Sequence, residues 1–264
     1  MGRTEQLILQ HSGRGMELLR PFLSDDFCAD AAKEILSWPK GTVLLTTGFY
    51  VAGKAETDGP AGTLFLAKAL EKLGYTPVVL TDEICRGYFE QFSVAVQYIP
   101  VEPQDFHGQK LLDDYRPVGL IAVERCGRNI HGDYANMRGV SIAPYTAPLD
   151  WLFVHASVPT VGIGDGGNEI GMGNLAAEIL ENLSLVPCEV NVDHLVISTV
   201  SNWGALGLCA ELGHLPQEEF YLQAYAAGEK LGFVDGVTKE VRQTEDGFSL
   251  ETGKKLLDAL KREI

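Results

Sequence analysis

The feature that most constrains the fold is a regular alternation of short apolar segments with helical segments. Five or six runs rich in Val, Ile and Leu have the length of buried strands, at residues 43–47, 76–82, 94–100, 118–124, 159–165 and 193–199. Buried strands that alternate with helices are typical of a parallel sheet covered on both faces. The sequence therefore predicts an α/β fold, with one three-layer, Rossmann-like domain over residues 1–264 and a mostly parallel sheet.

Two amphipathic patterns precede the first strand and predict an N-terminal helical cap over residues 1–40. The first covers about residues 5–19 with a break at Ser12-Gly13, and the second runs from an N-cap at Ser24 to Trp38. Further helices are expected between and after the strands, at residues 60–73, 83–92, 105–115, 149–156, 169–183, 203–212, 217–231 and 250–264.

The charge balance and the cysteines argue against several classes of function. The chain has 21 basic and 36 acidic residues, which argues against nucleic-acid partners and against binding to an anionic membrane. No apolar stretch is long enough to span a bilayer, and the N-terminus has no signal-peptide pattern. The five cysteines lie far apart without metal-ligand spacing, so neither a disulfide framework nor a zinc site is expected. A cytoplasmic location is the expectation that follows.

Polar residues and glycines follow five of the predicted strands at their carboxyl ends. Open α/β sheets bind ligands beyond these ends, so we expect the candidate site there. The residues at this rim include Thr47, Gly48, Asp82, Glu124, Arg125, Asp165, Ser201 and Asn202.

The glycine-rich segment 162–173 is the densest of these signals. The backbone amides of Gly166 and Gly167, beside a predicted helix start, can form an anion-binding nest. Asp165, Asn168 and Glu169 add polar side chains to the same loop. A tight strand-to-helix turn with glycines for close packing is the alternative interpretation.

The loop that follows residue 124 concentrates positive charge in an otherwise acidic chain. Arg125, Arg128 and Arg138 lie within fourteen residues, and guanidinium groups match carboxylates and phosphates bidentately. Asn136 can assist them. A solvated loop whose arginines pair with surplus carboxylates is the alternative.

Two further segments carry residues with two interpretations each. Glu56 and Asp58 precede the predicted helix at Pro60, so Asp58 can be an N-cap, or both can act in acid–base or metal chemistry. Ser201 and Asn202 also start a helix, where they can cap it or contact a ligand.

Seven separated motifs, in order, resemble those of the D-glutamate cyclase C-terminal-like family. They are TGF at 47–49, ETDGPAG at 56–62, ERCGR and YANMRG within 124–139, APLDWLF at 147–153, GIGDGGNEIGMG at 162–173, SNWGALGL at 201–208 and VDGVT at 234–238. The chain departs from the family pattern at Cys126 and Ser141, where Pro and Asp are usual. The resemblance implies an α/β fold and the conversion of D-glutamate to 5-oxo-D-proline with loss of water. In animal members this domain follows an unrelated one, which leaves open which domain carries the activity.

The residues support a scheme for such a cyclisation, which joins the α-amine of glutamate to its own γ-carboxyl carbon. Three arginines, Arg125, Arg128 and Arg138, are candidates to clamp the carboxylates of a small anionic amino-acid-like substrate. Candidates to accept the amine proton are Asp165, Glu169 and Asp58, and Glu124 or a neutral Asp58 can protonate the leaving oxygen. The amides of Gly166 and Gly167 are candidates to stabilise the oxyanion.

Two other functions remain open at this stage. Asp165, Glu169 and Asp58 can instead hold Mg²⁺ or Mn²⁺ as cofactor in an enzyme acting on a dicarboxylate or phosphorylated substrate. The chain can also be a non-catalytic binding module that needs a separately encoded partner. A homodimer is compatible with each of these functions.

Overall fold

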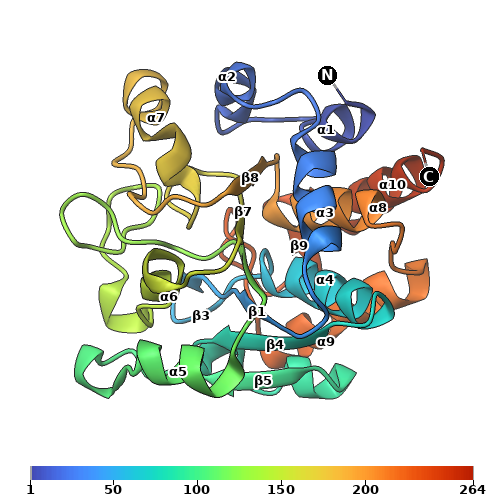
Figure 1. Cartoon of the computed structure of the whole chain (residues 1–264). Coiled ribbons are helices and arrows are strands. Elements are labelled where there is room, and N and C mark those ends of the chain that lie inside the picture. Colours follow the sequence, from blue (N-terminus) through green and yellow to red (C-terminus); the bar gives the residue numbers. More distant parts are fainter. Residues whose placement is uncertain (1, 264) are drawn as a thin grey trace.

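The computed structural model describes residues 2–263 and is built around a six-stranded sheet in which neighbouring strands run parallel. The order is β5–β4–β1–β6–β7–β8, which confirms the predicted three-layer α/β architecture (Figure 1). The strands are β1 (Thr42–Thr46), β4 (Thr76–Thr81), β5 (Ala95–Tyr98), β6 (Gly119–Val123), β7 (Thr160–Gly164) and β8 (His194–Ile197).

The central strands form where the sequence is continuously apolar, because helices cover both of their faces. In β1, the side chain of Leu44 is fully buried, and Leu44 is in register with Val78 of β4 and Leu120 of β6. A strand buried on both faces has no solvent side and therefore shows no polar alternation.

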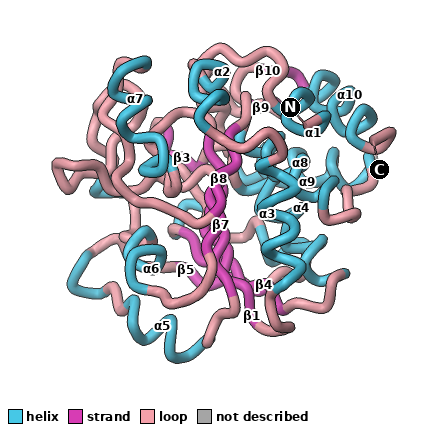
Figure 2. The backbone as a smooth tube through the Cα atoms, turned by 45° about the horizontal axis from the view of Figure 1, so that its top comes forward, coloured by secondary structure: helices cyan, strands magenta, loops and turns pink. Residues whose placement is uncertain are grey.

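Helices form the two outer layers, and Figure 2 shows the strands between them. One layer holds α3, α4 and α8, with α1, α9 and α10 packed against these helices, and the other holds α5, α6 and α7. Their bounds are α3 (Phe27–Ser37), α4 (Pro60–Lys72), α8 (Ser201–Glu211), α9 (Glu218–Leu231), α10 (Leu250–Leu260), α5 (Gly108–Tyr115), α6 (Asp150–His155) and α7 (Ala176–Asn182).

The N-terminal segment differs in detail from the predicted cap. The expected helix at 5–19 is split into α1 (Arg3–Ile8) and α2 (Met16–Leu19), and a connection that includes the predicted break at Ser12-Gly13 joins them. Helix α1 packs on α8 and α2 packs on α7, so the segment reaches both layers. Its connection brings Arg14 to the carboxyl end of the sheet.

Other predicted helices are shorter or absent. Residues 83–92 form two 3-10 turns (Glu83–Cys85 and Phe89–Phe92), with Gly87 at a φ of 86° between them. The helix predicted from residue 169 begins as an α-helix only at Ala176, after a 3-10 turn. Two small hairpins were not predicted: β2 (Tyr50–Val51) with β3 (Lys54–Ala55), and β9 (Thr244–Glu245) with β10 (Phe248–Ser249).

The order of the strands defines where a ligand can bind. From β1 the chain builds the sheet toward β4 and β5, and it then returns to the other side of β1 to add β6, β7 and β8. The connections that leave β1 and β6 therefore diverge, which opens a crevice at the carboxyl ends of these two strands.

Two helix N-termini at this crevice are capped reciprocally by one pair of side chains. The carboxylate of Asp58, just before α4, accepts hydrogen bonds from the amides of Ser201 (2.8 Å) and Asn202 (2.7 Å) of α8. The side-chain oxygen of Asn202 accepts hydrogen bonds from the amides of Gly59 (2.9 Å) and Gly62 (2.7 Å) of the α4 start. Each helix thus supplies the cap of the other, which fixes their relative position.

Removal of this shared cap should destabilise the fold. We expect Asn202→Ala to lower the free energy of unfolding by about 2 kcal/mol or more, because buried amide donors lose their acceptor. Urea unfolding followed by circular dichroism measures this change. The exposed Asn182 is the matched control, and Asn182→Ala should stay within about 0.5 kcal/mol of the unchanged protein. Equal effects of the two substitutions would contradict the shared-cap interpretation.

Candidate functional site

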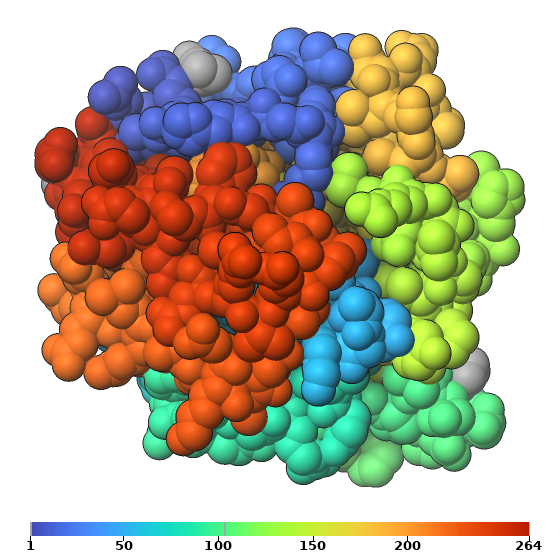
Figure 3. All heavy atoms as spheres, turned by 180° about the vertical axis from the view of Figure 1, so that it is seen from behind, coloured from blue at the N-terminus to red at the C-terminus, as the bar shows by residue number. Residues whose placement is uncertain are grey.

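A cavity of about 510 Å³ lies beyond the carboxyl ends of the central strands. Its lining comes from Arg14, the β2–β3 hairpin, the loop after β6, the loop after β7 and residues 236–239. Figure 3 shows the light-blue segment of the β2–β3 hairpin between the orange-red C-terminal segment and the yellow-green loop after β6. The cavity therefore gathers segments that lie far apart in the sequence.

Only some of the predicted site residues line this cavity. Those that do are Glu124, Asn136, Arg138, Asn168 and Glu169. The others do not line it: Thr47, Gly48, Asp58, Arg125, Arg128, Asp165, Gly166, Gly167, Ser201 and Asn202. Residues of the lining that sequence reasoning did not assign to the site include Arg14, Tyr50, Tyr145 and Lys239.

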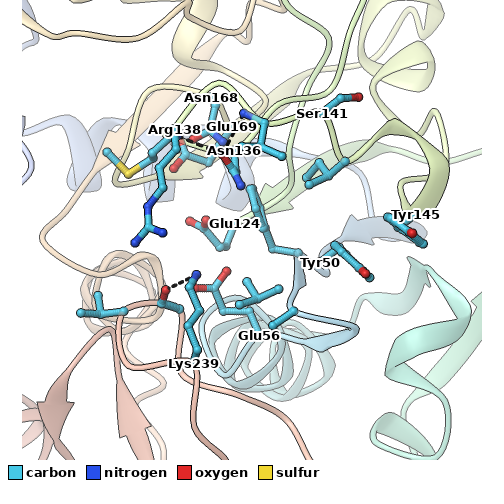
Figure 4. Close-up of a pocket in the computed structure, with 18 of the residues that line it drawn as sticks. Tyr50, Glu56, Glu124, Asn136, Arg138, Ser141, Tyr145, Asn168, Glu169 and Lys239 are labelled. Carbon is cyan, nitrogen blue, oxygen red and sulfur yellow. Dashed lines mark hydrogen bonds between the residues drawn. The ribbon is translucent and has the colours of Figure 1, made fainter.

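Three carboxylates, those of Glu56, Glu124 and Glu169, face the cavity, and Figure 4 shows them between two groups of other side chains. Asp58 and Asp165 are fully buried close to them, and Asp246 is almost fully buried. Carboxylate oxygens of Asp58, Asp165 and Asp246 lie within 4.8 Å of one another, as do those of Glu124, Asp165 and Glu169. Such crowding opposes full ionisation of the group.

Glu124 has the features of a strained functional residue. Its φ is 45°, a left-handed conformation that is uncommon for residues other than glycine. Its carboxylate accepts a hydrogen bond from the Ser201 hydroxyl at 2.6 Å. Burial, followed by the negative charges of Glu169, Asp58 and Asp246, raises the pKa of Glu124 well above its ordinary value. The neutral form of this carboxyl is therefore favoured more than that of an exposed glutamate.

Its neighbours respond to the same environment. Burial, with Asp246 and Glu124 nearby, raises the pKa of Glu56 well above its ordinary value. Burial and Asp246 raise the pKa of Asp58 to about 7, although amide donors partly oppose this shift. Within residues 2–263, no hydrogen bond or ion pair to the Glu56 carboxylate is observed, so this group is available to a ligand.

The glycine loop forms an anion nest, but the protein's own carboxylate occupies it. The amides of Gly166 and Gly167 each donate to the Glu169 carboxylate at 2.7 Å, and the Asp165 amide donates at 3.3 Å. The prediction that the amides of Gly166 and Gly167 stabilise an oxyanion is therefore wrong for this structure. Both amides already donate hydrogen bonds to Glu169, a contact that the sequence alone could not reveal.

The three arginines of the predicted clamp are dispersed. Arg125 is fully buried and bonded to Asp82 and to backbone carbonyls, including that of Ala147 at 2.6 Å. It therefore holds together the loops at the carboxyl ends of the strands. Arg128 is exposed and pairs with Glu189 at 3.1 Å. Of the three, Arg138 alone lines the cavity, so the predicted roles of Arg125 and Arg128 as a substrate clamp are not supported by their positions.

Thr47 and Gly48 likewise act inside the rim. The carbonyl of Thr47 accepts a hydrogen bond from the Thr81 hydroxyl at 2.9 Å, and the carbonyl of Gly48 accepts one from Arg125 at 3.1 Å. Gly48 has a φ of 103°, and a Cβ there would lie 2.8 Å from the Thr81 hydroxyl oxygen. These residues shape the turn after β1 and are not exposed to a ligand.

Arg14 supplies the positive charge at the bottom of the cavity. Its guanidinium lies 2.9 Å from an Asp165 oxygen and is also paired with Asp246. One oxygen of Asp165 and one of Asp246 are nevertheless buried without a hydrogen-bond partner. The acidic cluster is therefore only partly compensated by Arg14.

Asn136 and Asn168 stabilise the loops that border the cavity, the first within its own loop and the second between the two loops. The side-chain oxygen of Asn136 accepts hydrogen bonds from the amides of Arg138 (2.9 Å) and Val140 (3.1 Å), which closes the turn carrying Arg138. The Asn168 amide donates to the carbonyl of Ala135 at 2.8 Å. Both side chains therefore position the lining as well as contribute to it.

The C-terminal part of the lining is held by two buried acids. Asp235 accepts hydrogen bonds from the amides of Thr238 and Gly247, each at 2.7 Å, and so ties the loop of Lys239 to the β9–β10 hairpin. Glu245 anchors this hairpin through Trp203 at 2.8 Å and Tyr221 at 2.9 Å. The hairpin in turn holds Asp246 against Arg14.

The fold and the cavity together define a class: a Rossmann-like α/β protein with an acidic cavity bordered by basic side chains. The family model described as "D-glutamate cyclase-like, C-terminal" matches residues 4–261, and the chain belongs to this family.

The chain is similar to one curated relative and, weakly, to one solved structure. The human protein "D-glutamate cyclase, mitochondrial" is 32% identical over 200 residues, a match that covers 65% of this chain and 32% of the relative. The chain thus spans about a third of that relative's length. A structure of an exopolyphosphatase-related protein from Bacteroides fragilis aligns with 91% of this chain and 57% of its own chain, with 10% identity and a TM-score of 0.42.

Among the described residues, no helix has the length and apolarity needed to cross a membrane.

The buried acids should make stability depend on pH. The folded pKa of Asp58 and that of Glu245 are each raised to about 7, so the native state binds more protons than the unfolded chain between about pH 4 and pH 7. We therefore expect the free energy of unfolding to fall by about 1 kcal/mol or more as the pH rises from 5 to 7.5. Urea unfolding at constant ionic strength measures this dependence.

Variants separate this effect from the charge of the whole chain. Glu245→Gln should reduce the pH dependence, because the buried group no longer titrates. Glu181→Gln removes an exposed carboxylate and should leave the dependence unchanged. Stability that rises across this pH window would contradict the assignment.

Proposed function

We propose that the chain binds D-glutamate and converts it to 5-oxo-D-proline and water, which is a hydro-lyase reaction. The observation that carries this proposal is the arrangement of charge in the cavity, where the carboxyls of Glu56 and Glu124 face a border that carries Arg138 and Lys239. Membership of the D-glutamate cyclase-like family supports the substrate. Because the match covers only 32% of the human relative, its named activity comes to this chain as a proposal.

The substrate would bind with its charges matched to those of the cavity. Its ammonium group would lie at the acidic floor, where Glu169 is held in place by the glycine-loop amides. A substrate carboxylate would pair with Arg138 and Lys239 at the border, since guanidinium and ammonium groups bind carboxylates through charge-assisted hydrogen bonds. This arrangement bends glutamate and brings its amine toward its γ-carboxyl carbon.

Glu56 and Glu124 would carry the proton transfers. Glu56 would remove a proton from the ammonium, so that the nitrogen attacks the γ-carboxyl carbon, and the protonated Glu124 would donate to the departing oxygen. Two protons leave the nitrogen and two reach the departing oxygen. Glu56 and Glu124 therefore return to their starting protonation states when water is released. A raised pKa suits both roles, since an acid must hold a proton and a base must accept one near neutral pH.

Arg14 would stabilise the negative charge that develops on the γ-carboxyl oxygen during attack. Arg14 would thus have the role first predicted for the glycine-loop amides, which are already bonded to Glu169. Asp165 and Asp246 would hold Arg14 in position for this role.

The test is formation of 5-oxo-D-proline from D-glutamate, measured by chiral chromatography with L-glutamate as a parallel substrate. Glu124→Gln should lower kcat by about 100-fold, because the acid is lost while the shape of the site is kept. Arg138→Ala should mainly raise KM, by about tenfold or more, because a charge-assisted contact to the substrate is lost.

Arg128→Ala is the matched control, since Arg128 lies in the same loop but outside the cavity. Its kinetic constants should stay within about twofold of those of the unchanged protein. No product with either enantiomer would contradict the cyclase proposal. Binding of glutamate without turnover would instead favour a binding module that needs a partner.

A second candidate is a divalent-metal enzyme that acts on another small anionic substrate. The specific observation in its favour is that Asp165 and Asp246 each keep a buried oxygen without a partner, inside two groups of close carboxylates. Oxygen ligands of this kind suit Mg²⁺ or Mn²⁺. Arg14 already provides one positive charge in the cluster, so this candidate requires the ion to share these acids with the guanidinium.

Calorimetric titration with Mn²⁺ distinguishes the two candidates. If the cluster holds a metal, Mn²⁺ should bind with about one-to-one stoichiometry, and Asp165→Asn should weaken binding by about tenfold or more, since a ligand charge is lost. Glu181→Gln, at an exposed site, should leave the affinity unchanged. Turnover of D-glutamate that EDTA does not affect, together with no heat of Mn²⁺ binding, would exclude this candidate.

A further inference from the structure

The cavity is larger than free glutamate needs. Its 510 Å³ would hold about seventeen waters at roughly 30 Å³ each, whereas glutamate has about ten non-hydrogen atoms. Volumes of this size are typical of sites for larger ligands. Space therefore remains when glutamate is bound as proposed above.

The unfilled part of the cavity has its own chemistry. Tyr50 and Tyr145 are stacked, with ring centroids 3.9 Å apart and an interplanar angle of 6°. Phe49, Val51 and Ile142 add apolar side chains to the lining. The protein thus presents an aromatic and apolar wall, defined by these five residues, in the same cavity as the acids.

The wall and the basic side chains lie on different sides of the reacting groups. Figure 4 shows Arg138 to the left of Glu124, Lys239 below it beside Glu56, and Tyr50 and Tyr145 to the right. A substrate whose carboxylate binds the basic side and whose γ-carbon lies near Glu124 would therefore direct any γ-substituent toward the tyrosines.

We propose that the site also accepts D-glutamate whose γ-carboxyl is joined as an amide to an aromatic or apolar amine, and that it cyclises this compound with release of the amine. The inference rests on the proposed function, because it uses the same acid–base pair. The α-nitrogen forms a bond to the γ-carbonyl carbon, and the bond from that carbon to the amide nitrogen breaks. The α-ammonium loses two protons, one of which reaches the departing amine by way of Glu124 while the other goes to solvent.

The experiment uses γ-D-glutamyl-p-nitroanilide, whose cyclisation releases the coloured p-nitroaniline. D-Glutamate is assayed in parallel by chiral chromatography, and the same chromatography detects 5-oxo-D-proline from the anilide. We expect kcat/KM for the anilide to be at least tenfold higher than for D-glutamate, because an amine attacks an uncharged anilide carbonyl more readily than a carboxylate and the ring packs on the wall.

Variants of the wall test the placement of the ring. Tyr145 is 46% exposed, so its truncation should not unfold the protein, and thermal unfolding checks this. Tyr145→Ala should raise KM for the anilide about threefold or more and change KM for D-glutamate less. Tyr145→Phe keeps an aromatic ring and should restore the KM for the anilide.

The two substrates distinguish the two proposals. Turnover of D-glutamate without release of p-nitroaniline overturns this inference and leaves the proposed function in place. Release of p-nitroaniline together with 5-oxo-D-proline supports the inference even where D-glutamate itself is inert, which would overturn only the proposed substrate. Absence of both products, or release that Tyr145→Ala and Glu124→Gln do not affect, overturns the inference.

Discussion

The burial of six carboxylates around one end of the sheet is the constraint on which the rest of the structure depends. Transfer of ionised groups from water into a protein interior is unfavourable unless each gains a partner or a proton. The chain uses all three available responses: backbone amides for Asp58 and Glu169, a guanidinium for Asp165 and Asp246, and raised pKa values for Glu56 and Glu124. Glu56 and Glu124 combine a raised pKa with a place in the cavity lining, so they can exchange protons with a ligand.

The Rossmann-like topology supplies these partners from the backbone. Diverging connections at β1 and β6 bring the N-terminus of α8 and the glycine loop to one crevice, where their amides point inward. In many proteins of this class such amides hold a ligand phosphate. Here Asp58 and Glu169 occupy them, so the protein itself provides the anions. Because these amides are occupied, an anionic group of the proposed substrate would be bound by side chains such as Arg138 and Lys239.

The fold could be predicted from the sequence because apolar runs such as Val43–Leu45 indicate strands that are buried on both faces. The site could be predicted only in part. Acids and glycines at strand ends indicated its place, but three arginines close in sequence proved to have three environments, since a loop turns its side chains independently. Arg14 and Lys239 were missed because they reach the cavity from segments distant in the sequence, and no local pattern marks such a contact.

The distribution of charge also restricts what the cavity can hold. A purely anionic molecule would be attracted to Arg138 and Lys239 but would also face the carboxyls of Glu56 and Glu124. A molecule with an ammonium group and a carboxylate matches both regions. Because the two regions have opposite sign, they favour one orientation of such a molecule. In the proposed binding mode, that orientation would place the reacting carbon beside Glu124, and the apolar side of the cavity would accommodate whatever the carbon carries.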